Sequence, residues 1–317
     1  MLIRVFLISF LVSLPFWWGT NVLGEKLENF FFWQEISQNP QIFTAQVNLE
    51  KTLESLKPFR TGEVENLEIE AKSAVSVLIK NDGTSKILFE KEKNKKLPIA
   101  SLTKLMTVLV VLENYDLSKT VKISKEAVSQ ESEFGNLKIG EKFSVANLLY
   151  PLLMESSNDA AYALSEVIGE KEFIDLMNIK AANLDLEKTF FVNPTGLDPD
   201  SLNELTNYST TEDLVKLTDY LLKNQPKIWE ILGTLEFDLY SPDGIFHHRL
   251  KNTNELLKEI PQIGGKTGWT PQAQGCLVLV QKAPENGGIV INVILGSENR
   301  FGEMKKLVDW LNQAYRW

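Results

Sequence analysis

The sequence predicts an α+β fold in which a mainly antiparallel sheet is flanked by helices and carries a helical lobe, inserted between an N-terminal hairpin and the C-terminal strands. Strand-like runs occur at both ends of the folded body, at residues 74–89 and 264–295. Between them, apolar residues recur at the three- and four-residue steps of helices. No repeat unit recurs along the chain. Strands far apart in the sequence must therefore meet in one sheet.

The N-terminal hairpin is the first element of this body. Residues 74–79 and 87–89 are rich in Val, Ile and Leu, and Asn81-Asp82-Gly83 lies between them. An Asx-Gly pair between two apolar runs is typical of a tight β-turn. A basic loop at residues 91–96 follows the second strand.

The middle of the chain, to about residue 225, is predicted to be mostly helical. Helix starts are marked by side chains that cap free backbone N–H groups, and glycine commonly marks a helix end. The expected caps and ends are Ser144 before 145–154, Asn158 or Asp159 before a helix that ends at Gly169, and Thr210 before 214–222.

The C-terminal third returns to strands and closes with an amphipathic helix. The expected strands are 235–240, 264–269, 276–282 and 288–295, and the expected helix is 300–317. The polar segment 243–248 is typical of a turn.

The first 24 residues (1–24) are predicted to be a signal peptide or an N-terminal membrane anchor. Arg4 precedes an apolar run, residues 5–18, that has the length of a signal-peptide core and is short for a membrane span. If the run is extended through Leu23, a tilted span becomes possible. In either case we expect the rest of the chain to be exported.

Residues 25–65 are predicted to be a stalk or extension that leads to the folded body, residues 66–317. The aromatic residues at 30–33 are typical of an interfacial anchor, although they can equally pack on the folded domain. Residues 45–56 have helical spacing.

The composition is that of a globular protein with mixed surface charge. Hydrophobic residues make up 44% of the chain and charged residues 24%, with a formal net charge of −9. The negative charge and the lack of a basic stripe argue against a nucleic-acid partner. Cys276 is the only cysteine, so an intramolecular disulfide is excluded, and we expect this thiol to be buried in a strand.

Metal chemistry and histidine chemistry are both disfavoured. His247 and His248 are the only histidines, and with a single cysteine they cannot form a zinc site of the usual spacing. We therefore predict no metal and no cofactor. A Ser-His-Asp triad would have to use one of these two adjacent residues, which lie in the turn-like segment without another catalytic signature.

One stretch, residues 98–107, combines a helix start with reactive side chains. Apolar residues spaced by three and four positions after Ser101 predict a buried helix that begins at this serine. A serine in that place is usually only a cap. Lys104, however, is three residues on and shares the helix face of Ser101, so its amine can reach the hydroxyl. A nucleophile beside a base is the arrangement that covalent catalysis requires, and burial or a second cation would favour the neutral amine.

Two further motifs follow in a fixed order. Ser101-x-x-Lys104 is followed by Ser156-Ser157-Asn158 and then by Lys266-Thr267-Gly268. This set resembles that of the low-molecular-weight penicillin-binding proteins, which are serine-type D-alanyl-D-alanine carboxypeptidases. The segments around the motifs carry the resemblance over roughly residues 66–317, most clearly at 98–107, 152–161, 191–197, 252–257 and 264–270.

The resemblance implies a β-lactamase/transpeptidase-like fold and a role for each motif residue. Ser101 would be the nucleophile, Lys104 the proton acceptor, and Ser156 a proton shuttle to the leaving amine. The substrate-binding residues that the resemblance implies are Asn158, Lys266, Thr267, Gly268, Trp269 and Arg300.

These binding residues would act in three ways. The Asn158 amide would contact the substrate's peptide carbonyl, Lys266 and Thr267 would bind the terminal carboxylate, and the N–H groups of Ser101 and Trp269 would form an oxyanion hole. Arg300 aligns with an arginine that in relatives helps to bind the carboxylate, but it can also be a surface residue of the last helix. Family members vary at Trp269.

The implied function is removal of the terminal D-alanine from peptidoglycan stem peptides, with β-lactam antibiotics as covalent inhibitors. Cleavage of peptide cross-links by a D,D-endopeptidase, β-lactamase activity, and a non-catalytic membrane-tethered scaffold stay open as alternatives. In the commonest serine β-lactamases a glutamate lies in a Glu-x-x-Leu-Asn segment, and this sequence has two Leu-Asn pairs, at 202–203 and 311–312. Here Pro199 and Val308 occupy the two corresponding places, so a β-lactamase is disfavoured. Many relatives carry a second domain and a C-terminal amphipathic anchor, whereas this sequence stops with the helix that ends at Trp317. We therefore expect any membrane attachment to be at the N-terminus.

Overall fold

The computed structural model describes five parts of the chain, residues 26–27, 34, 57–130, 136–201 and 204–317. The predicted leader, the aromatic residues at 30–33 and the helix expected over 45–56 lie outside these residues.

The chain divides into two units, residues 1–60 with Arg316 and residues 61–315 with Trp317. In the first unit Lys26, Leu27 and Gln34 are helical, and β1 is Phe59–Arg60. Everything below concerns the second unit. Among the described residues, no helix combines the length and the hydrophobicity that crossing a membrane requires.

The predicted antiparallel sheet is present, with five strands in the order β10-β11-β12-β2-β3. N-terminal and C-terminal strands meet where β12 pairs with β2, as Ile291 faces Val77. Strand β10 lies at one edge of the sheet. The strands are β2 (Ser73–Ile79), β3 (Ser85–Lys91), β10 (Gly264–Thr270), β11 (Gln274–Lys282) and β12 (Ile289–Ser297).

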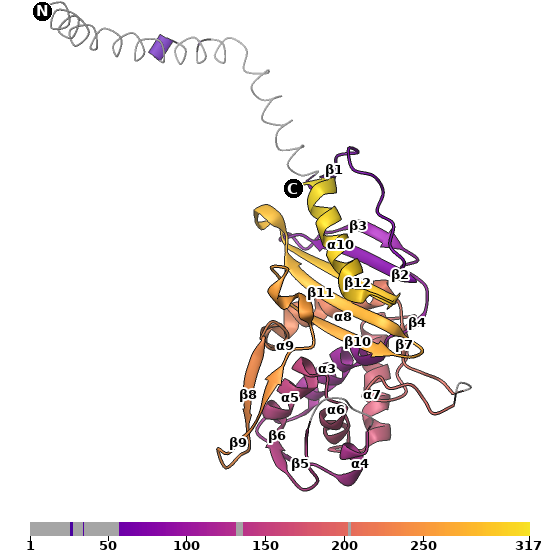
Figure 1. Ribbon diagram of the computed structural model, residues 1–317, viewed down its shortest axis with the longest axis vertical. Helices are drawn as coiled ribbons and strands as arrows, with labels where there is room; N and C mark the ends of the chain where they lie inside the picture. Colours follow the sequence, from indigo (N-terminus) through magenta and orange to yellow (C-terminus); the bar gives the residue numbers. More distant parts are fainter. Residues whose placement is uncertain (1–25, 28–33, 35–56, 131–135, 202–203) are drawn as a thin grey trace, which may run out of the picture. The chain divides into compact units, whose positions relative to one another are not determined.

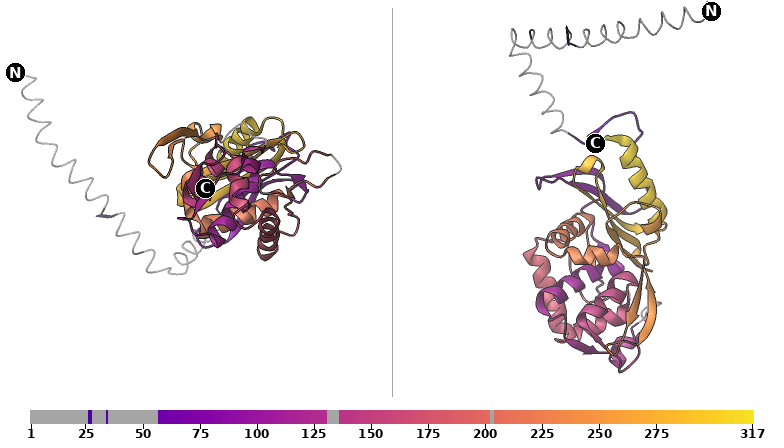
Figure 2. Two further views of the ribbon diagram at one scale, coloured as in Figure 1. Left: turned by 90° about the horizontal axis from the view of Figure 1, so that it is seen from below. Right: turned by 90° about the vertical axis from the view of Figure 1, so that its left-hand side faces the viewer.

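Each face of the sheet is covered by helices, because both faces carry apolar side chains (Figures 1 and 2). Helix α10 (Arg300–Ala314) buries Leu307 and Leu311 against strand residues such as Leu277. On the other face, helix α8 (Thr211–Asn224) and the helical lobe share a larger core that contains Val293. Burial of a leucine side chain stabilises the fold by about 1.5–3 kcal/mol.

The helical lobe lies between β3 and β10 in sequence, as predicted. Its helices are α3 (Lys104–Asn114), α4 (Lys125–Val128), α5 (Val145–Met154), α6 (Asn158–Ser165), α7 (Glu170–Asn183) and α9 (Pro226–Leu232), with 3₁₀ turns η1 (Ala100–Thr103) and η2 (Glu255–Lys258). A third 3₁₀ turn, η3 (Pro284–Asn286), joins β11 to β12.

Short strands pair at the lobe's margins. The pairs are β4 (Leu97–Pro98) with β7 (Tyr208–Ser209), β5 (Thr120–Lys122) with β6 (Lys142–Ser144), and β8 (Glu236–Tyr240) with β9 (Phe246–Lys251). The chain ends with β13 (Tyr315–Arg316).

The predicted helix caps are confirmed at two helices. The Ser144 hydroxyl accepts from the N–H of Asn147 at 3.1 Å, and the Thr210 hydroxyl accepts from the N–H of Asp213 at 3.1 Å. At α6 the cap is Ser157, one residue before the expected Asn158, and its hydroxyl accepts from the N–H of Ala160.

Three expected element boundaries were wrong. The α6 helix ends at Ser165, and Gly169, with φ of 99°, instead precedes α7, because only glycine enters that conformation without strain. Helix α10 stops at Ala314, because Tyr315 is extended and its hydroxyl donates to the Leu88 carbonyl at 2.5 Å. The segment 246–248 belongs to β9, because it pairs with β8 as a hairpin.

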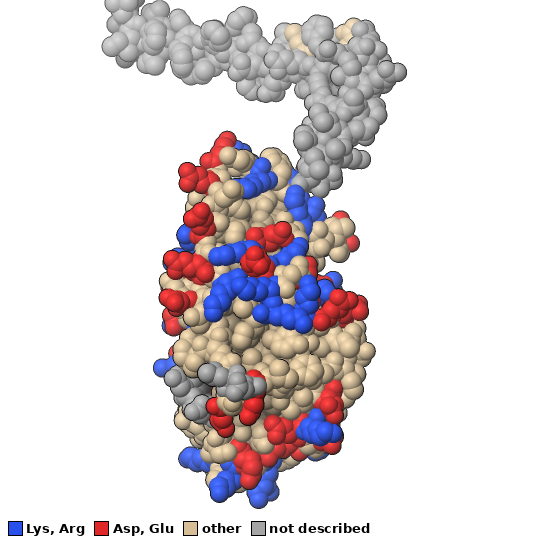
Figure 3. Space-filling model, turned by 90° about the vertical axis from the view of Figure 1, so that its right-hand side faces the viewer, with Lys and Arg blue, Asp and Glu red and all other residues tan. Residues whose placement is uncertain are grey.

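Figure 3 shows Lys and Arg side chains in a band across the middle of one face, with Asp and Glu on both sides of it. The sequence did not predict this gathering, because residues far apart in the chain meet only on folding. Carboxylates also contact the basic loop itself, where Lys93 pairs with Glu90 at 2.9 Å and with Glu212 at 3.7 Å.

Cys276 is free and buried, as expected, and its burial raises the pKa of the thiol to about 12.

Candidate active site

Ser101 lies in a tight turn rather than at a helix cap. The 3₁₀ turn η1 begins at Ala100, one residue before the expected start, and leads directly into α3. No side chain caps this turn. Ala100 is buried and has φ of 47°, a conformation that costs a non-glycine residue about 1–3 kcal/mol and recurs at functional sites. The capping interpretation of Ser101 therefore fails, and its hydroxyl faces Lys104.

Lys104 is fully buried on the first turn of α3 and contacts three acceptors. Its Nζ lies 2.9 Å from Ser101 Oγ, 2.6 Å from Asn158 Oδ1 and 2.6 Å from the Thr195 carbonyl oxygen. Burial, and secondarily the charge of Lys266, holds the pKa of Lys104 well below its usual value. This environment favours a neutral amine beside the hydroxyl.

Lys266 faces the same site from the edge strand β10. Its Nζ donates to Ser156 Oγ at 2.8 Å and to the Thr267 carbonyl at 2.9 Å. Burial, and then the neighbouring charge of Arg300, lowers the pKa of Lys266 to about 7. Near neutral pH Lys266 is therefore partly charged, while the pKa of Lys104 is also held well below its usual value.

Ser156 is held in an unusual backbone conformation between α5 and α6. Its φ is 62°, in the left-handed region that disfavours side chains, and its hydroxyl contacts Lys266. Thr253 links the main chain before Ser156 to β10, because its N–H donates to the Met154 carbonyl and its hydroxyl lies 2.6 Å from that of Thr267. Ser156 and β10 are therefore fixed relative to one another.

Gly268 allows β10 to approach the turn that carries Ser101. A Cβ atom at this position would lie 3.0 Å from the Ser101 nitrogen and 3.1 Å from the Ile99 carbonyl oxygen, which is too close for most side chains. Trp269, the next residue, is 60% exposed. The strand edge therefore runs beside Ser101.

Arg300 lies at the start of α10, where the Asn299 side chain accepts from the N–H of Gly302. Its guanidinium stacks over the Phe301 ring at 4.6 Å, and its Nε has no hydrogen-bond partner among the described residues. Gly275 on β11 makes room for it, because a Cβ there would lie 3.0 Å from Arg300 Cβ. Gly275 pairs with Trp269 across the β10–β11 ladder, so Arg300 lies beside the strand that carries Lys266, and its charge contributes to the lowered pKa of Lys266.

The structure thus brings the residues of all three motifs together. Sequence reasoning missed the Thr195 carbonyl, Thr253 and Gly275, and it gave no site role to Asn193. The segment 191–197 did carry a signal, since it resembles the family. A main-chain acceptor, however, has no residue type by which a motif could identify it.

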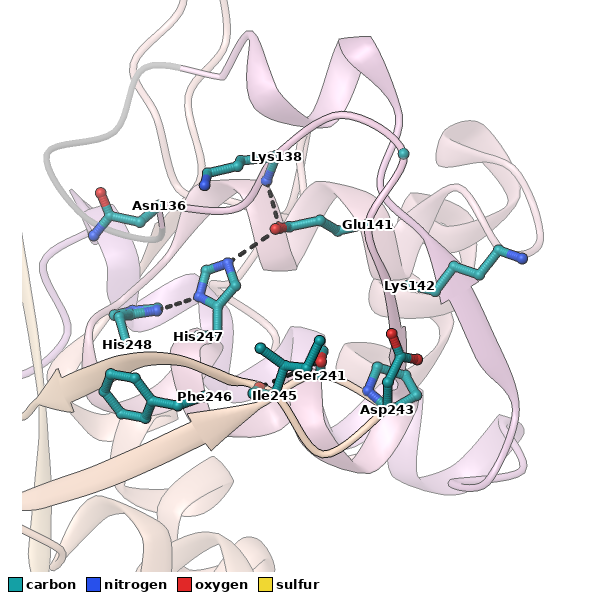
Figure 4. A pocket seen from close by; sticks show the side chains of 12 residues that line it. Asn136, Lys138, Glu141, Lys142, Ser241, Asp243, Ile245, Phe246, His247 and His248 are labelled. Carbon is teal, nitrogen blue, oxygen red and sulfur yellow. Dashed lines mark hydrogen bonds and ion pairs between the residues drawn. The ribbon is translucent and has the colours of Figure 1, made fainter.

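The two histidines lie at a separate cavity, which is lined by residues of the segment 136–142 and by residues of 241–248 in the β8–β9 hairpin (Figure 4). His247 Nε2 lies 3.1 Å from Glu141 Oε2, His248 Nε2 lies 3.2 Å from Glu155 Oε2, and the two Nδ1 atoms are 2.5 Å apart. Within the described residues these are their side-chain hydrogen bonds, so neither histidine contacts Ser101 or Ser156. Nor do the described residues contain a cluster of three His, Cys, Asp or Glu side chains able to hold a metal.

Residues 60–299 match the family model described as D-alanyl-D-alanine carboxypeptidase, Peptidase_S11. The chain belongs to this family. The sequence-based resemblance and the predicted fold are therefore confirmed. Both the motif order and the geometry around Ser101 agree with membership in the D-alanyl-D-alanine carboxypeptidase family.

Individual members of the family extend the comparison. The D-alanyl-D-alanine carboxypeptidase DacF of Bacillus subtilis is 36% identical over 81% of this chain and 65% of its own length. A D-alanyl-D-alanine endopeptidase of Pseudomonas aeruginosa is 31% identical over 74% of this chain and 76% of its own. The structure is similar to penicillin-binding protein D2 of Listeria monocytogenes in its cefotaxime-bound form, with a TM-score of 0.64 and 29% identity over 78% of this chain and 99% of that one.

Proposed function

We propose that this chain is a serine D,D-carboxypeptidase that removes the terminal D-alanine from peptidoglycan stem peptides through an acyl-enzyme on Ser101. The observation that carries the proposal is the contact between the Ser101 hydroxyl and the buried, pKa-lowered amine of Lys104, 2.9 Å apart. Family membership supports the substrate class.

The first step is proton transfer from Ser101 to Lys104. A neutral amine has two protons and one lone pair. The Asn158 and Thr195 oxygens accept the two protons, so the lone pair faces the Ser101 hydroxyl. Ser101 Oγ then attacks the carbonyl carbon between the two D-alanines while Lys104 takes the proton, and general base catalysis of this kind contributes about 10²- to 10⁴-fold.

Collapse of the tetrahedral intermediate breaks the C–N bond and releases D-alanine. Its amine needs a proton, and Ser156, which can both donate and accept, supplies it as the shuttle between the lysines and the leaving group. The N–H groups of Ser101 and Trp269 stabilise the oxyanion. Gly268 allows these two N–H groups to lie close together. Water then attacks the ester carbon, with Lys104 again as base, and frees Ser101.

The terminal carboxylate of the substrate binds to the positively charged side of the site. Lys266 and Arg300 supply charge, and the Thr267 hydroxyl supplies a hydrogen bond. This assignment gives the two neighbouring cations a partner, because the substrate brings the anion.

The same proposal covers the organisation of the whole protein. Residues 66–317 are the D,D-peptidase catalytic domain, residues 1–24 a signal peptide or anchor, and residues 25–65 an extension between them. The catalytic domain acts at the extracytoplasmic face of the bacterial membrane or after secretion, where peptidoglycan lies. β-Lactams acylate Ser101 in place of the peptide.

The test is labelling with a fluorescent penicillin followed by digestion of purified peptidoglycan fragments. We expect the wild type to be labelled and Ser101→Ala to remain unlabelled. The wild type should remove one alanine from pentapeptides, as detected by mass spectrometry. An unlabelled wild type, or equal label on Ser101→Ala, would support the non-catalytic scaffold.

A D,D-endopeptidase is the second candidate, because a relative with that name covers most of the catalytic domain. Loss of cross-linked dimers without loss of terminal alanine from pentapeptides would favour it. The same samples test for a β-lactamase. We expect penicillin to stay on Ser101 for minutes or longer, because no glutamate precedes either Leu-Asn pair.

A further inference from the structure

The Thr195 carbonyl that accepts from Lys104 Nζ belongs to an irregular loop, so something other than regular secondary structure must fix its direction. Residues 192–197 are neither helix nor strand, yet Thr195 is 2% exposed. An irregular main-chain segment that places an acceptor 2.6 Å from a buried amine needs its own hydrogen bonds.

Asn193 fixes the peptide unit that carries this carbonyl. Its Oδ1 accepts from the Gly196 N–H at 2.7 Å and from the Thr195 N–H at 3.2 Å. The N–H and the carbonyl of a trans peptide point in opposite directions. Because the Gly196 N–H points at Asn193, the Thr195 carbonyl of the same peptide points away from it, toward Lys104.

Asn207 joins this loop to the helix turn that carries the lysine. The Asn207 side chain is buried, and its Nδ2 donates to the Asn193 carbonyl at 3.0 Å and to the Thr103 hydroxyl at 2.9 Å. Its Oδ1 accepts from the Val192 N–H at 2.7 Å. Thr103 immediately precedes Lys104, so one amide sets the amine and its carbonyl acceptor relative to each other.

The loop also packs closely against the turn that carries Ser101. Gly196 has φ of 88°, and a Cβ there would lie 2.0 Å from the Ala100 carbonyl oxygen. On the far side, the Thr107 hydroxyl of α3 donates to the Pro194 carbonyl at 2.7 Å. The loop therefore has little freedom to move once Asn193 and Asn207 are in place.

We propose that Asn207, acting through Asn193 and the Thr195 carbonyl, is a positioning residue that aims the lone pair of Lys104 at Ser101. The inference rests on the proposed function, because it assigns Lys104 the part of the base. The carbonyl takes one proton of the neutral amine and also stabilises the ammonium that forms once the Ser101 proton has been transferred. Asn207 itself does not touch the reacting atoms.

The test measures acylation of full-length protein by a fluorescent penicillin as a function of pH and penicillin concentration. In Asn207→Ala we expect the acylation rate constant on the pH plateau to fall about 10- to 100-fold, the cost of a misplaced catalytic group. The dissociation constant of the complex before acylation should stay within about threefold of the wild type, because Asn207 does not face the substrate. The acid limb of the profile should move to lower pH, because losing an acceptor weakens the ammonium form.

Asn178→Ala is the matched control. Asn178 binds the same loop at Phe191, accepting from its N–H at 2.9 Å and donating to its carbonyl at 2.8 Å, but it does not contact Thr103 or Asn193. We expect this variant to lose stability and to keep the wild-type rate constant and acid limb. Equal changes in the two asparagine variants would show a general loosening of the loop and would overturn the inference.

Other outcomes separate this inference from the proposed function. A wild type that penicillin does not acylate overturns both. A wild type that is acylated, with Asn207→Ala matching it in rate constant and acid limb, overturns the inference alone. If Asn207→Ala does not fold, the isosteric Thr107→Val is the second variant. It loses the hydrogen bond to the Pro194 carbonyl at 2.7 Å and the longer one to the Thr103 carbonyl at 3.4 Å. It should lower the rate constant about three- to tenfold, and Thr107→Ser should restore it. Equal rates in these two variants contradict the inference.

Discussion

The two buried lysines of the site, Lys104 on α3 and Lys266 on β10, differ in their partners more than in their burial. Both are 0% exposed, and burial is the main cause of the lowered pKa of each. Lys104 contacts Ser101 and two fixed oxygens of an amide and a main-chain carbonyl. Lys266 contacts Ser156 and lies near Arg300. The comparison teaches that burial makes a lysine able to lose its proton, whereas its partners decide whether it serves as a base or as a cation.

The largest expected effect is that of removing the Lys104 amine. We expect Lys104→Ala to lower the acylation rate constant by about 10³-fold or more, because general base catalysis is lost. The affinity of the complex before acylation should change little. Rapid-mixing measurements with penicillin separate the two quantities. A variant that binds poorly but acylates at the wild-type rate constant would place Lys104 in substrate binding.

The matching change at Lys266 should have a different signature. In Lys266→Ala we expect kcat/KM for a D-alanyl-D-alanine peptide to fall about 10²-fold, mostly through KM, because a cation that pairs with the carboxylate is lost. Steady-state kinetics on pentapeptide and on its C-terminal amide provide the check. The amide lacks the charge, so it should lose far less. Equal losses on both substrates would contradict the assignment.

The pH dependence of substrate binding sharpens the contrast further. Because the pKa of Lys266 is about 7, the fraction of charged lysine in the free enzyme falls as the pH rises through that value. We therefore expect KM for the carboxylate peptide to rise severalfold between about pH 6 and pH 9, while KM for the amide stays flat. Parallel profiles for both substrates would remove Lys266 from carboxylate binding.

The smallest expected effect concerns stability. Lys266 is charged in the unfolded chain up to its ordinary pKa and is deprotonated in the folded chain above about pH 7, so its burial destabilises the fold most at and below that pH. Stability should therefore rise with pH from about 7 toward the ordinary pKa of lysine. Lys266→Met should raise the free energy of unfolding by about 1–2 kcal/mol at pH 6 and by less at pH 9, although kcat/KM falls.

Denaturant unfolding at the two pH values measures this difference. The control is Lys171→Met, at a lysine whose side chain is 85% exposed and for which we expect no pH-dependent gain. A loss of stability in Lys266→Met at pH 6 would mean that its hydrogen bonds to Ser156 and to the Thr267 carbonyl outweigh the cost of burying the amine.

The same two lysines show how far sequence reasoning reaches. Ser101 and Lys104 are three residues apart at a helix start, so helical geometry alone predicted their contact. Lys266 and Ser156 are far apart in sequence, and only the family resemblance placed them together. The strands of the sheet were likewise predicted, because apolar runs and the turn residues between them are local signals in the sequence.

What could not be predicted depends on main-chain atoms and on tertiary contacts. The Thr195 carbonyl has no signature in the sequence, and the conformations of Ala100 and Ser156 are imposed by the surrounding structure. Helix α10 was expected to continue to residue 317, but the docking of Tyr315 on β3 ends it earlier. Gly169 was expected to end a helix, yet it precedes one.

The most direct test of the account is the pH profile of Ser101 acylation in the wild type, followed by intact-protein mass spectrometry and by mapping of the modified peptide. We expect the penicillin adduct on Ser101 and a rate constant that reaches its plateau well below the ordinary pKa range of lysine, because burial holds the pKa of Lys104 well below its usual value. A rate constant that keeps rising through the ordinary pKa range of lysine, or an adduct on another residue, would contradict the central claim.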